Sequence, residues 1–202
     1  MAGLGFSQGD IDKMKTGDIR KMTFATVRTI DQRVKYIKEL ILKSSASAPI
    51  VERARSIVAR KCGDTWCVPE KDWWAEVKAI FDFCRKNLRY TRDHRIVDQF
   101  SSAEASLRMK AGDCDDGTIL LGSLLMAIGY TVKCRVIQSQ GASTWSHIYL
   151  MVGLPPTGTP TRWVPLDWSV NKPAGWQVDG ADESLRTGKP AGLVVKVKDF
   201  DV

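Results

Sequence analysis

The sequence predicts an α+β fold in which helices come first and strands follow. Two observations predict this class. Apolar residues recur every three or four positions through most of residues 29–88, which is the spacing of amphipathic helices. After residue 130 the pattern changes to short alternating or β-branched segments separated by Gly and Pro, which is typical of strands joined by turns. With 202 residues, 44% of them hydrophobic, the chain can bury a sizeable core.

Three helices are expected in the first half of the chain. They follow an arm, residues 1–20, that is rich in Gly and charge and has little periodicity. The first helix begins at Thr29 and ends in the Ser-rich residues 44–47. The second begins at Pro49, because proline is tolerated in the first turn of a helix. The third has Asp72 as its N-cap and carries a strong apolar stripe.

The two halves meet in the segment Gly112-Asp113-Cys114-Asp115-Asp116. A Gly-Asp turn leads to the cysteine, two acids follow it, and an apolar run continues to Ile128. This pattern predicts a helix that starts at or just after Cys114. The unpaired N–H groups and the positive dipole end of a helix N-terminus lower the pKa of a thiol and favour the reactive thiolate. The two acids act in the opposite sense, so we expect a nearby histidine to help.

Strands supply the partners for this cysteine. Four strands are expected, at residues 131–139, 146–152, 162–166 and 193–197. His147 lies in the second of them, and Asp167 directly follows the third. A thiolate, an imidazole that takes and returns a proton, and a carboxylate that orients the imidazole make an acyl-transfer set. The sequence therefore predicts that Cys114, His147 and Asp167 converge.

Four blocks of the sequence resemble the transglutaminase-like superfamily. They are residues 112–114 with the apolar helix that follows, 129–136, 145–147 and 164–167. The resemblance runs from about Trp73 to Trp168, with the catalytic blocks in the order of the family. It implies a papain-like core, in which the helix that starts at the cysteine packs on an antiparallel sheet. We expect residues 1–68 to form an arm and a helical extension, and residues 69–202 to form the catalytic domain.

The resemblance also assigns roles to the three residues. It implies that Cys114 is the nucleophile, that His147 is the general base and acid, and that Asp167 orients His147. The implied reaction is attack on an amide or ester carbonyl to give a thioacyl enzyme. Hydrolysis of peptide or isopeptide bonds is preferred over cross-linking, but the sequence leaves open whether water or an amine is the second nucleophile. A protein or peptide substrate is expected, with a peptidoglycan peptide as one option, and no metal or cofactor.

Further side chains complete the expected site. An oxyanion hole needs a donor besides the N–H of the cysteine, and Gln99, Trp145 and Tyr90 are candidates. Trp145 and Trp168 flank the predicted histidine and aspartate in sequence and are expected to screen the ion pair from water. The second histidine of the chain, His94, lies among charged residues and is assigned to a surface loop.

A different class of function stays open. Chains of this kind resemble proteins encoded among the particle genes of tailed bacteriophages, so the alternative is a structural or assembly protein of the head or tail. All of the net charge of +7 lies in residues 1–100, which hold 20 Lys and Arg against 13 Asp and Glu. Basic N-terminal helices could dock on a virion protein, whereas nucleic-acid binding is disfavoured because the cations are scattered among acids. Without a membrane span or an evident signal peptide, we expect a cytoplasmic location or a particle assembled there.

Five cysteines make an odd count. Cys62 and Cys67 could hold half of a zinc site or form a disulfide, but no second Cys/His pair stands nearby to complete four zinc ligands. Cys84 lies on an apolar helix face and Cys134 in a strand, so both are expected to be buried. Reduced thiols are the default expectation without a signal peptide.

Overall fold

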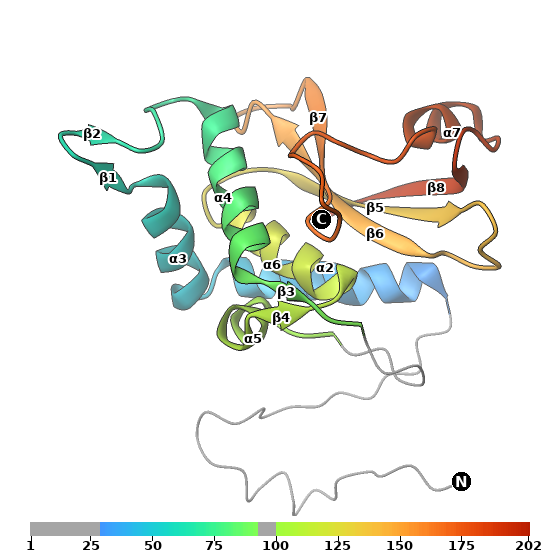
Figure 1. The fold of residues 1–202 in the computed structure, drawn as a ribbon, viewed down its shortest axis with the longest axis horizontal. Helices are drawn as coiled ribbons and strands as arrows, with labels where there is room; N and C mark the ends of the chain where they lie inside the picture. Colours follow the sequence, from blue (N-terminus) through green and yellow to red (C-terminus); the bar gives the residue numbers. More distant parts are fainter. Residues whose placement is uncertain (1–28, 93–99) are drawn as a thin grey trace, which may run out of the picture.

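The computed structural model describes residues 29–92 and 100–202 and combines a helical layer with an antiparallel sheet (Figure 1). The predicted arm at residues 1–20 lies outside the described residues. The helices are α2 (Ile30–Ser45), α3 (Ala48–Val58), α4 (Trp73–Asn87), α5 (Ala103–Met109), α6 (Cys114–Met126) and α7 (Ala181–Thr187). The strands are β1 (Lys61–Cys62), β2 (Thr65–Trp66), β3 (Arg89–Tyr90), β4 (Ala111–Gly112), β5 (Val132–Ser139), β6 (His147–Leu154), β7 (Arg162–Leu166) and β8 (Val194–Asp201). The predicted α+β class is confirmed.

The main sheet has four strands in the order β7-β6-β5-β8, and every neighbouring pair is antiparallel. The predicted strands at 131–139, 146–152 and 162–166 match β5, β6 and β7, and the last expected strand extends to Asp201 as β8. The register pairs Leu150 of β6 with Leu166 of β7, so the start of β6 and the end of β7 lie at the same end of the sheet. Since successive side chains point to opposite faces, the sheet presents an apolar layer on both sides.

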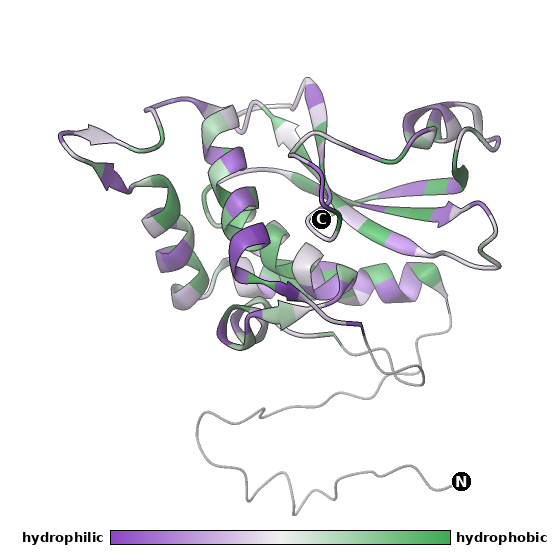
Figure 2. Ribbon diagram, viewed as in Figure 1, coloured by the Kyte–Doolittle hydropathy of each residue, from purple (hydrophilic) through white to green (hydrophobic). Residues whose placement is uncertain are grey.

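Helix α6 lies at the centre of the core, between the sheet and the other helices (Figure 1). Figure 2 shows that it is apolar or neutral around most of its circumference. Its residues from Asp115 to Leu125 are all buried, which is typical of a helix surrounded by other elements. The inner sheet face packs on this helix through residues such as Ile148 and Leu150. The outer face packs on α7 and the C-terminal segment through Tyr149 and Met151.

Helix α2 begins with a capping box. The side chain of Thr29 accepts a hydrogen bond from the backbone N–H of Gln32, and the Gln32 side chain accepts one from the N–H of Thr29. Its predicted stripe is confirmed: Val34, Ile37 and Ile41 are fully buried. These side chains belong to the same core cluster as the leucines of α6. The division of the chain at residues 68 and 69 stays a prediction.

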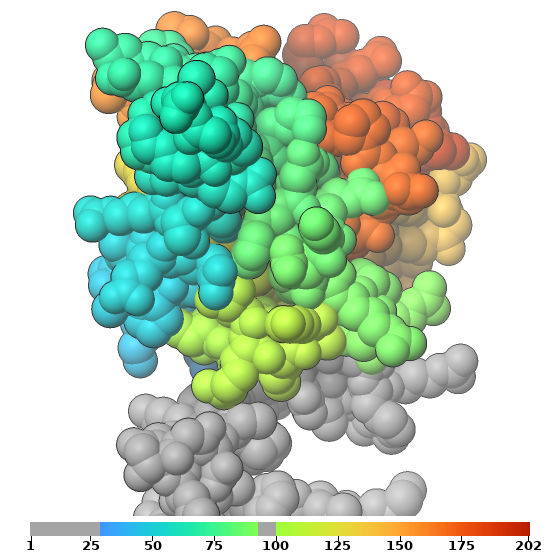
Figure 3. Space-filling model, turned by 60° about the vertical axis from the view of Figure 1, so that its left-hand side comes forward, coloured from blue at the N-terminus to red at the C-terminus, as the bar shows by residue number. Residues whose placement is uncertain are grey.

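Helix α4 begins at the predicted cap. The Asp72 carboxylate accepts a hydrogen bond from the N–H of Ala75 at 2.9 Å. Near the other end of the helix, Arg85 donates to the carbonyls of Val170 and Lys172, which fastens the segment after β7 to the helix. Figure 3 shows the green surface of α4 beside the orange surface of that segment. Trp73, in contrast, is 43% exposed, so the predicted apolar stripe starts one turn later.

Two local features differ from the sequence-based expectation. Cys62 and Cys67 form a disulfide across the short hairpin of β1 and β2, with their Cα atoms 5.0 Å apart, so reduced thiols are wrong for this pair. That separation is ordinary for a disulfide. Helix α7 has no counterpart among the elements that the sequence predicts; it lies in the tail after residue 171, between two glycines with positive φ, Gly180 and Gly188. Within residues 29–92 and 100–202, no helix is long and apolar enough to cross a bilayer.

Candidate active site

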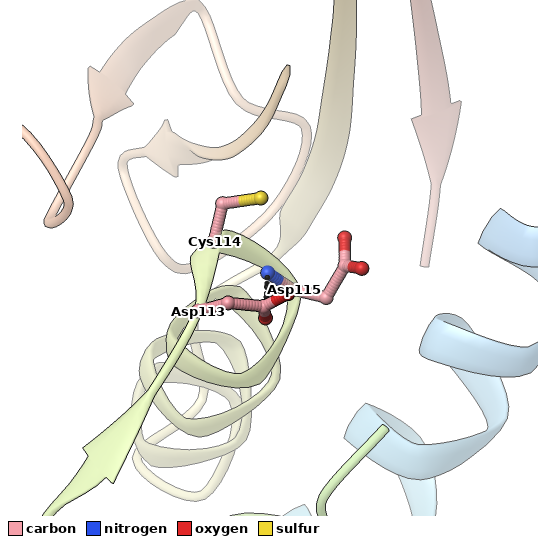
Figure 4. A group of neighbouring side chains, drawn as sticks. All are labelled: Asp113, Cys114 and Asp115. Carbon is pink, nitrogen blue, oxygen red and sulfur yellow. Dashed lines mark hydrogen bonds between the residues drawn. The ribbon is translucent and has the colours of Figure 1, made fainter. Parts of the chain in front are cut away.

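The site is built around the first turn of α6. Strand β4 pairs in parallel with β3, which brings Tyr90 beside Gly112 and directs the chain into the helix. Asp113 is the N-cap: its carboxylate accepts hydrogen bonds from the N–H groups of Asp115 at 2.9 Å and Asp116 at 3.1 Å. Cys114 is therefore the first residue of α6, as predicted. Figure 4 shows its thiol at the open end of the helix, pointing away from the helix axis.

Asp116 holds the approach to this turn in place. Its carboxylate accepts from the N–H of Ser101 at 2.7 Å and from the N–H of Asp113 at 3.4 Å. These two hydrogen bonds require glycine at position 112, since a Cβ there would lie 2.5 Å from the Cβ of Asp116. The carboxylates of Asp113 and Asp116 thus both accept hydrogen bonds from backbone N–H groups, and together they shape the turn that presents Cys114.

A second part of the site lies where β6 begins and β7 ends. The Nε2 atom of His147 lies 2.7 Å from Oδ2 of Asp167. The other carboxylate oxygen of Asp167 accepts from the hydroxyl of Ser169 at 2.7 Å and from its N–H at 3.2 Å. Asp167 is buried, whereas His147 is partly exposed. The carboxylate is therefore fixed from both sides and can hold the imidazole in one orientation.

The two parts meet in a small cavity of about 70 Å³. Cys114, His147 and Trp145 line it, together with Ile148. The N–H of Ile148, the residue next to His147, lies close enough to the sulfur to lower its pKa. In the described part of the chain no hydrogen bond joins the sulfur to the imidazole. Such catalytic hydrogen bonds are often looser in a free enzyme and tighten when substrate binds.

The electrostatics of the site favour a neutral thiol. The pKa of Cys114 is raised above its ordinary value, first because burial disfavours the thiolate and then because Asp115 and Asp113 lie nearby. The Ile148 N–H and the cation of Arg33 act in the opposite sense. The helix N-terminus alone therefore does not ionise this cysteine. A thiolate would need a partner that accepts its proton.

Trp168 packs against the first turn of α6. A Cβ on Gly117 would lie 1.8 Å from Nε1 of Trp168, so only glycine leaves room for the indole. The Tyr90 ring also contacts the indole, with 5.9 Å between ring centroids. The indole N–H is buried and has no hydrogen-bond partner among the residues that the structure describes. Because Trp168 follows Asp167 directly, this packing also sets the distance between the end of β7 and the cysteine helix.

The oxyanion-hole candidates lie in different places. Trp145 lines the small cavity with Cys114. Tyr90 is exposed at the edge of the site, and its pKa is raised by partial burial and then by the charges of Cys114 and Asp113. Gln99 lies outside the described residues, as does His94. These assignments stay predictions.

Two features near the site bear on other functions. Asp113, Cys114 and Asp115 each have one possible metal-ligand atom, and these three atoms lie within 4.8 Å of one another. Among the described residues, this is the group that could hold a metal ion. The Asp113 carboxylate is already occupied as the N-cap, and that of Asp115 accepts from Arg33. A larger hollow of about 610 Å³, lined by Trp73, Trp74 and residues of the β6–β7 turn, contains none of the predicted catalytic residues.

Two residues of the site have no counterpart in the sequence-based prediction. Ser169 fixes Asp167, and the only available signal is an Asp-Trp-Ser order in which a hydroxyl can reach back to a carboxylate two residues earlier. Arg33 lines the cavity from α2. In the sequence, Arg33 stands beside the apolar positions of this helix, as many surface arginines do, and nothing there indicates a place in the site.

The chain was compared with known proteins. A sequence profile described as the transglutaminase-like superfamily matches residues 60–168. No relative was found among curated proteins. A solved structure of a candidate protease from Parabacteroides distasonis is similar in fold, with a TM-score of 0.57 and 12% identity. That match covers 85% of this chain but only 30% of the other, so the chain spans less than a third of that protein's length.

Two further solved structures match at lower similarity. A candidate cysteine protease from Cytophaga hutchinsonii has a TM-score of 0.47 and 14% identity over 81% of this chain and 47% of that one. LapG from Legionella pneumophila has a TM-score of 0.45 and 14% identity over 68% of this chain and 73% of that one. The profile match spans more than half of the 202 residues and contains Cys114, His147 and Asp167. The chain therefore belongs to the transglutaminase-like superfamily.

Proposed function

We propose that the protein is a cysteine-dependent acyl-transfer enzyme that hydrolyses peptide or isopeptide bonds through Cys114, His147 and Asp167. The observation that carries the proposal is the 2.7 Å contact between His147 Nε2 and Asp167 Oδ2 at the cavity that Cys114 also lines. A buried carboxylate that holds an imidazole beside a thiol is the arrangement that nucleophilic catalysis needs. Membership of the superfamily supports the same reaction class.

The proton transfers follow from the side of the ring that Asp167 occupies. A carboxylate that accepts a hydrogen bond from Nε2–H leaves the lone pair on Nδ1, so Nδ1 is the nitrogen that can take the thiol proton. The resulting thiolate attacks the amide carbonyl carbon, and the carbonyl oxygen becomes an oxyanion. As the C–N bond breaks, the imidazolium returns the proton to the leaving amine, which leaves a thioacyl enzyme.

Water completes the cycle. Nδ1 takes a proton from water while the hydroxide attacks the thioester, and the carboxylic acid leaves as the sulfur recovers its proton. The backbone N–H of Cys114 is one oxyanion donor. Trp145, Tyr90 and Gln99 stay candidates for the second. An amine in place of water would make the enzyme a transferase, so the chemistry up to the thioester is common to both outcomes.

The raised thiol pKa determines how Cys114 is expected to ionise. Because burial and two acids oppose an isolated thiolate, the sulfur ionises only together with protonation of His147, as a thiolate–imidazolium pair. In a water-poor site the attraction within such a pair is stronger than in bulk solvent. Buried Trp168 and the partly buried Trp145 support this screening. Removing His147 is therefore expected to leave an inert thiol.

Labelling with iodoacetamide at pH 7 tests the proposal. Peptide mapping by mass spectrometry follows Cys114 against Cys84 and Cys134, two buried thiols that serve as internal controls. We expect Cys114 to react at least tenfold faster than either control, and His147→Ala to abolish the difference. Equal and slow labelling of all three would refute the proposal. Added methylamine, followed as a mass increase on a cleaved peptide, distinguishes transfer from hydrolysis.

The substrate is proposed as a protein or peptide, with a peptidoglycan peptide among the options. The assembly-protein alternative of a phage head or tail stays a prediction, and no contact of the described residues favours it over hydrolysis. Cleavage is best measured on a mixed peptide library with Cys114→Ala as the inactive control. Products that appear equally with this variant would argue against the thiol as nucleophile.

A further inference from the structure

One wall of the catalytic cavity comes from outside the matched family segment. Ile30 and Arg33 of α2 line the cavity together with Cys114 and His147. The family match begins at residue 60, so α2 precedes it by a whole helix. The N-terminal helix therefore contributes side chains to the site as well as to the core.

Arg33 contacts the residue next to the nucleophile. Its Nη2 atom donates to Oδ2 of Asp115, which is only 1% exposed. The guanidinium also lies 5.5 Å from the centre of the Phe100 ring, within the range of a cation–π contact. Figure 4 shows the carboxylate of Asp115 and the thiol of Cys114 together at the N-terminal turn of α6. Loss of the guanidinium would remove a positive charge that compensates this buried carboxylate.

The charge of Asp115 bears directly on the thiol. Ligand atoms of Asp113, Cys114 and Asp115 all lie within 4.8 Å of one another. At that distance a carboxylate opposes the formation of a thiolate, and a cation bound to the carboxylate offsets this effect. The causes that shift the pKa of Cys114 agree with this reasoning: burial raises it most, Asp115 and Asp113 raise it further, and Arg33 lowers it.

We propose that Arg33 is a positioning residue for the thiol chemistry: by binding Asp115 it offsets the negative charge that would otherwise keep Cys114 from forming a thiolate. This inference rests on the proposed function. Among residues 29–92 and 100–202, the charged and titratable groups that face the thiol are Asp113 and Asp115 on α6, Arg33 on α2, His147 on β6 and Tyr90 on β3. The guanidinium of Arg33 keeps its positive charge throughout the reaction, because arginine does not lose its proton in proteins.

The test is the pH dependence of Cys114 alkylation by iodoacetamide in the full chain. In Arg33→Gln we expect the midpoint of the profile to rise by about one pH unit and the rate at pH 7 to fall about tenfold. Arg33→Lys keeps the charge and should recover most of the rate. Lys35→Gln makes the same charge change on an exposed residue of α2 and should stay within about twofold of the wild type.

A second variant covers the case in which Arg33→Gln does not fold. Asp115→Asn removes the carboxylate charge while Arg33 remains, so the midpoint is expected to fall and the rate at pH 7 to rise. The double variant Arg33→Gln/Asp115→Asn should lie near the wild type, because both charges are gone. A wild-type midpoint in folded Arg33→Gln, or in Asp115→Asn, would overturn the inference.

The readouts separate this inference from the proposed function. If wild-type Cys114 shows no rapid alkylation that depends on His147, the proposed function fails. If it does and the profiles of the Arg33 and Asp115 variants coincide with it, only the inference fails. A purely structural role for Arg33 would lower the melting temperature without moving the midpoint, which circular dichroism on the same samples reveals.

Discussion

Gly117→Ala tests the packing that joins the cysteine helix to the end of β7. The added Cβ would lie 1.8 Å from Nε1 and 1.9 Å from Cε2 of Trp168. Carbon atoms in good contact lie about 3.5–4.0 Å apart, so the indole or the helix would have to move by about 2 Å. Trp168 is buried and its indole packs against the ring of Tyr90, so the indole has little room to rotate away.

The expected cost follows from two opposing effects. Alanine in place of a helical glycine gains about 1 kcal/mol of helix propensity. Overpacking of a well-packed core costs about 1–3 kcal/mol, and more when the neighbour is rigid. We expect a net loss of about 2 kcal/mol in the free energy of unfolding. For a chain of 202 residues this corresponds to a fall in Tm of about 4–8 °C.

Thermal unfolding followed by circular dichroism measures the effect, and Gly122→Ala is the matched control on the same helix. A Cβ on Gly122 would meet Cδ1 of Ile41 at 3.1 Å and Cδ1 of Leu150 at 3.2 Å, which are flexible chain ends that can shift. This variant should stay within about 1 kcal/mol of the wild type. If Gly117→Ala proves as stable as Gly122→Ala, the packing argument is wrong.

Three further predictions concern stability. Asp72→Ala removes the N-cap of α4 and should cost about 1 kcal/mol in urea unfolding; no change would mean that the cap contributes nothing. Arg135→Met leaves the partly buried Asp199 without its two-pronged partner and should cost about 3 kcal/mol, whereas Asp182→Asn, at the exposed end of the same network, should cost less than about 1 kcal/mol. Burial raises the pKa of Cys134 to about 12, so the neutral folded thiol stabilises the protein fully below the ordinary thiol pKa and progressively less as pH rises toward 12. Cys134→Ala removes this thiol, so the free energy of unfolding should fall less steeply between pH 9 and 11, by about 1.4 kcal/mol per pH unit. An unchanged slope would contradict this.

The sequence predicted those helices and strands whose ends are marked by neighbouring residues, such as caps and turns. Helix α6 begins at Cys114 because Asp113 caps it and apolar helix formers follow, and all of this is visible in the sequence. Strand β7 matches its predicted range because a short apolar run is bounded by turn residues. Helix α7 was not predicted, since it has only seven residues and lies between glycines. One of its residues, Asp182, binds Arg135 of β5, so α7 depends partly on a contact that no local pattern reveals.

The site could be predicted only as a set of residue types in order. Motif order indicated Cys114, His147 and Asp167, but their relative placement depends on the register of β6 and β7 and on how α6 packs against the sheet. The raised pKa of Cys114 has the same origin, because burial is its largest cause and burial is a property of the fold. Arg33 was missed because the pairing of α2 with α6 joins residues 82 positions apart.

The position of α2 has a practical consequence for anyone who trims this chain. A recombinant fragment cut to the matched family segment, residues 60–168, would lack the three fully buried side chains that α2 contributes and would expose one flank of an almost wholly apolar α6. Such a fragment is expected to aggregate, and its failure to cleave a substrate would carry no information about the nucleophile. Expression boundaries should therefore begin no later than Thr29, where the capping box starts the helix.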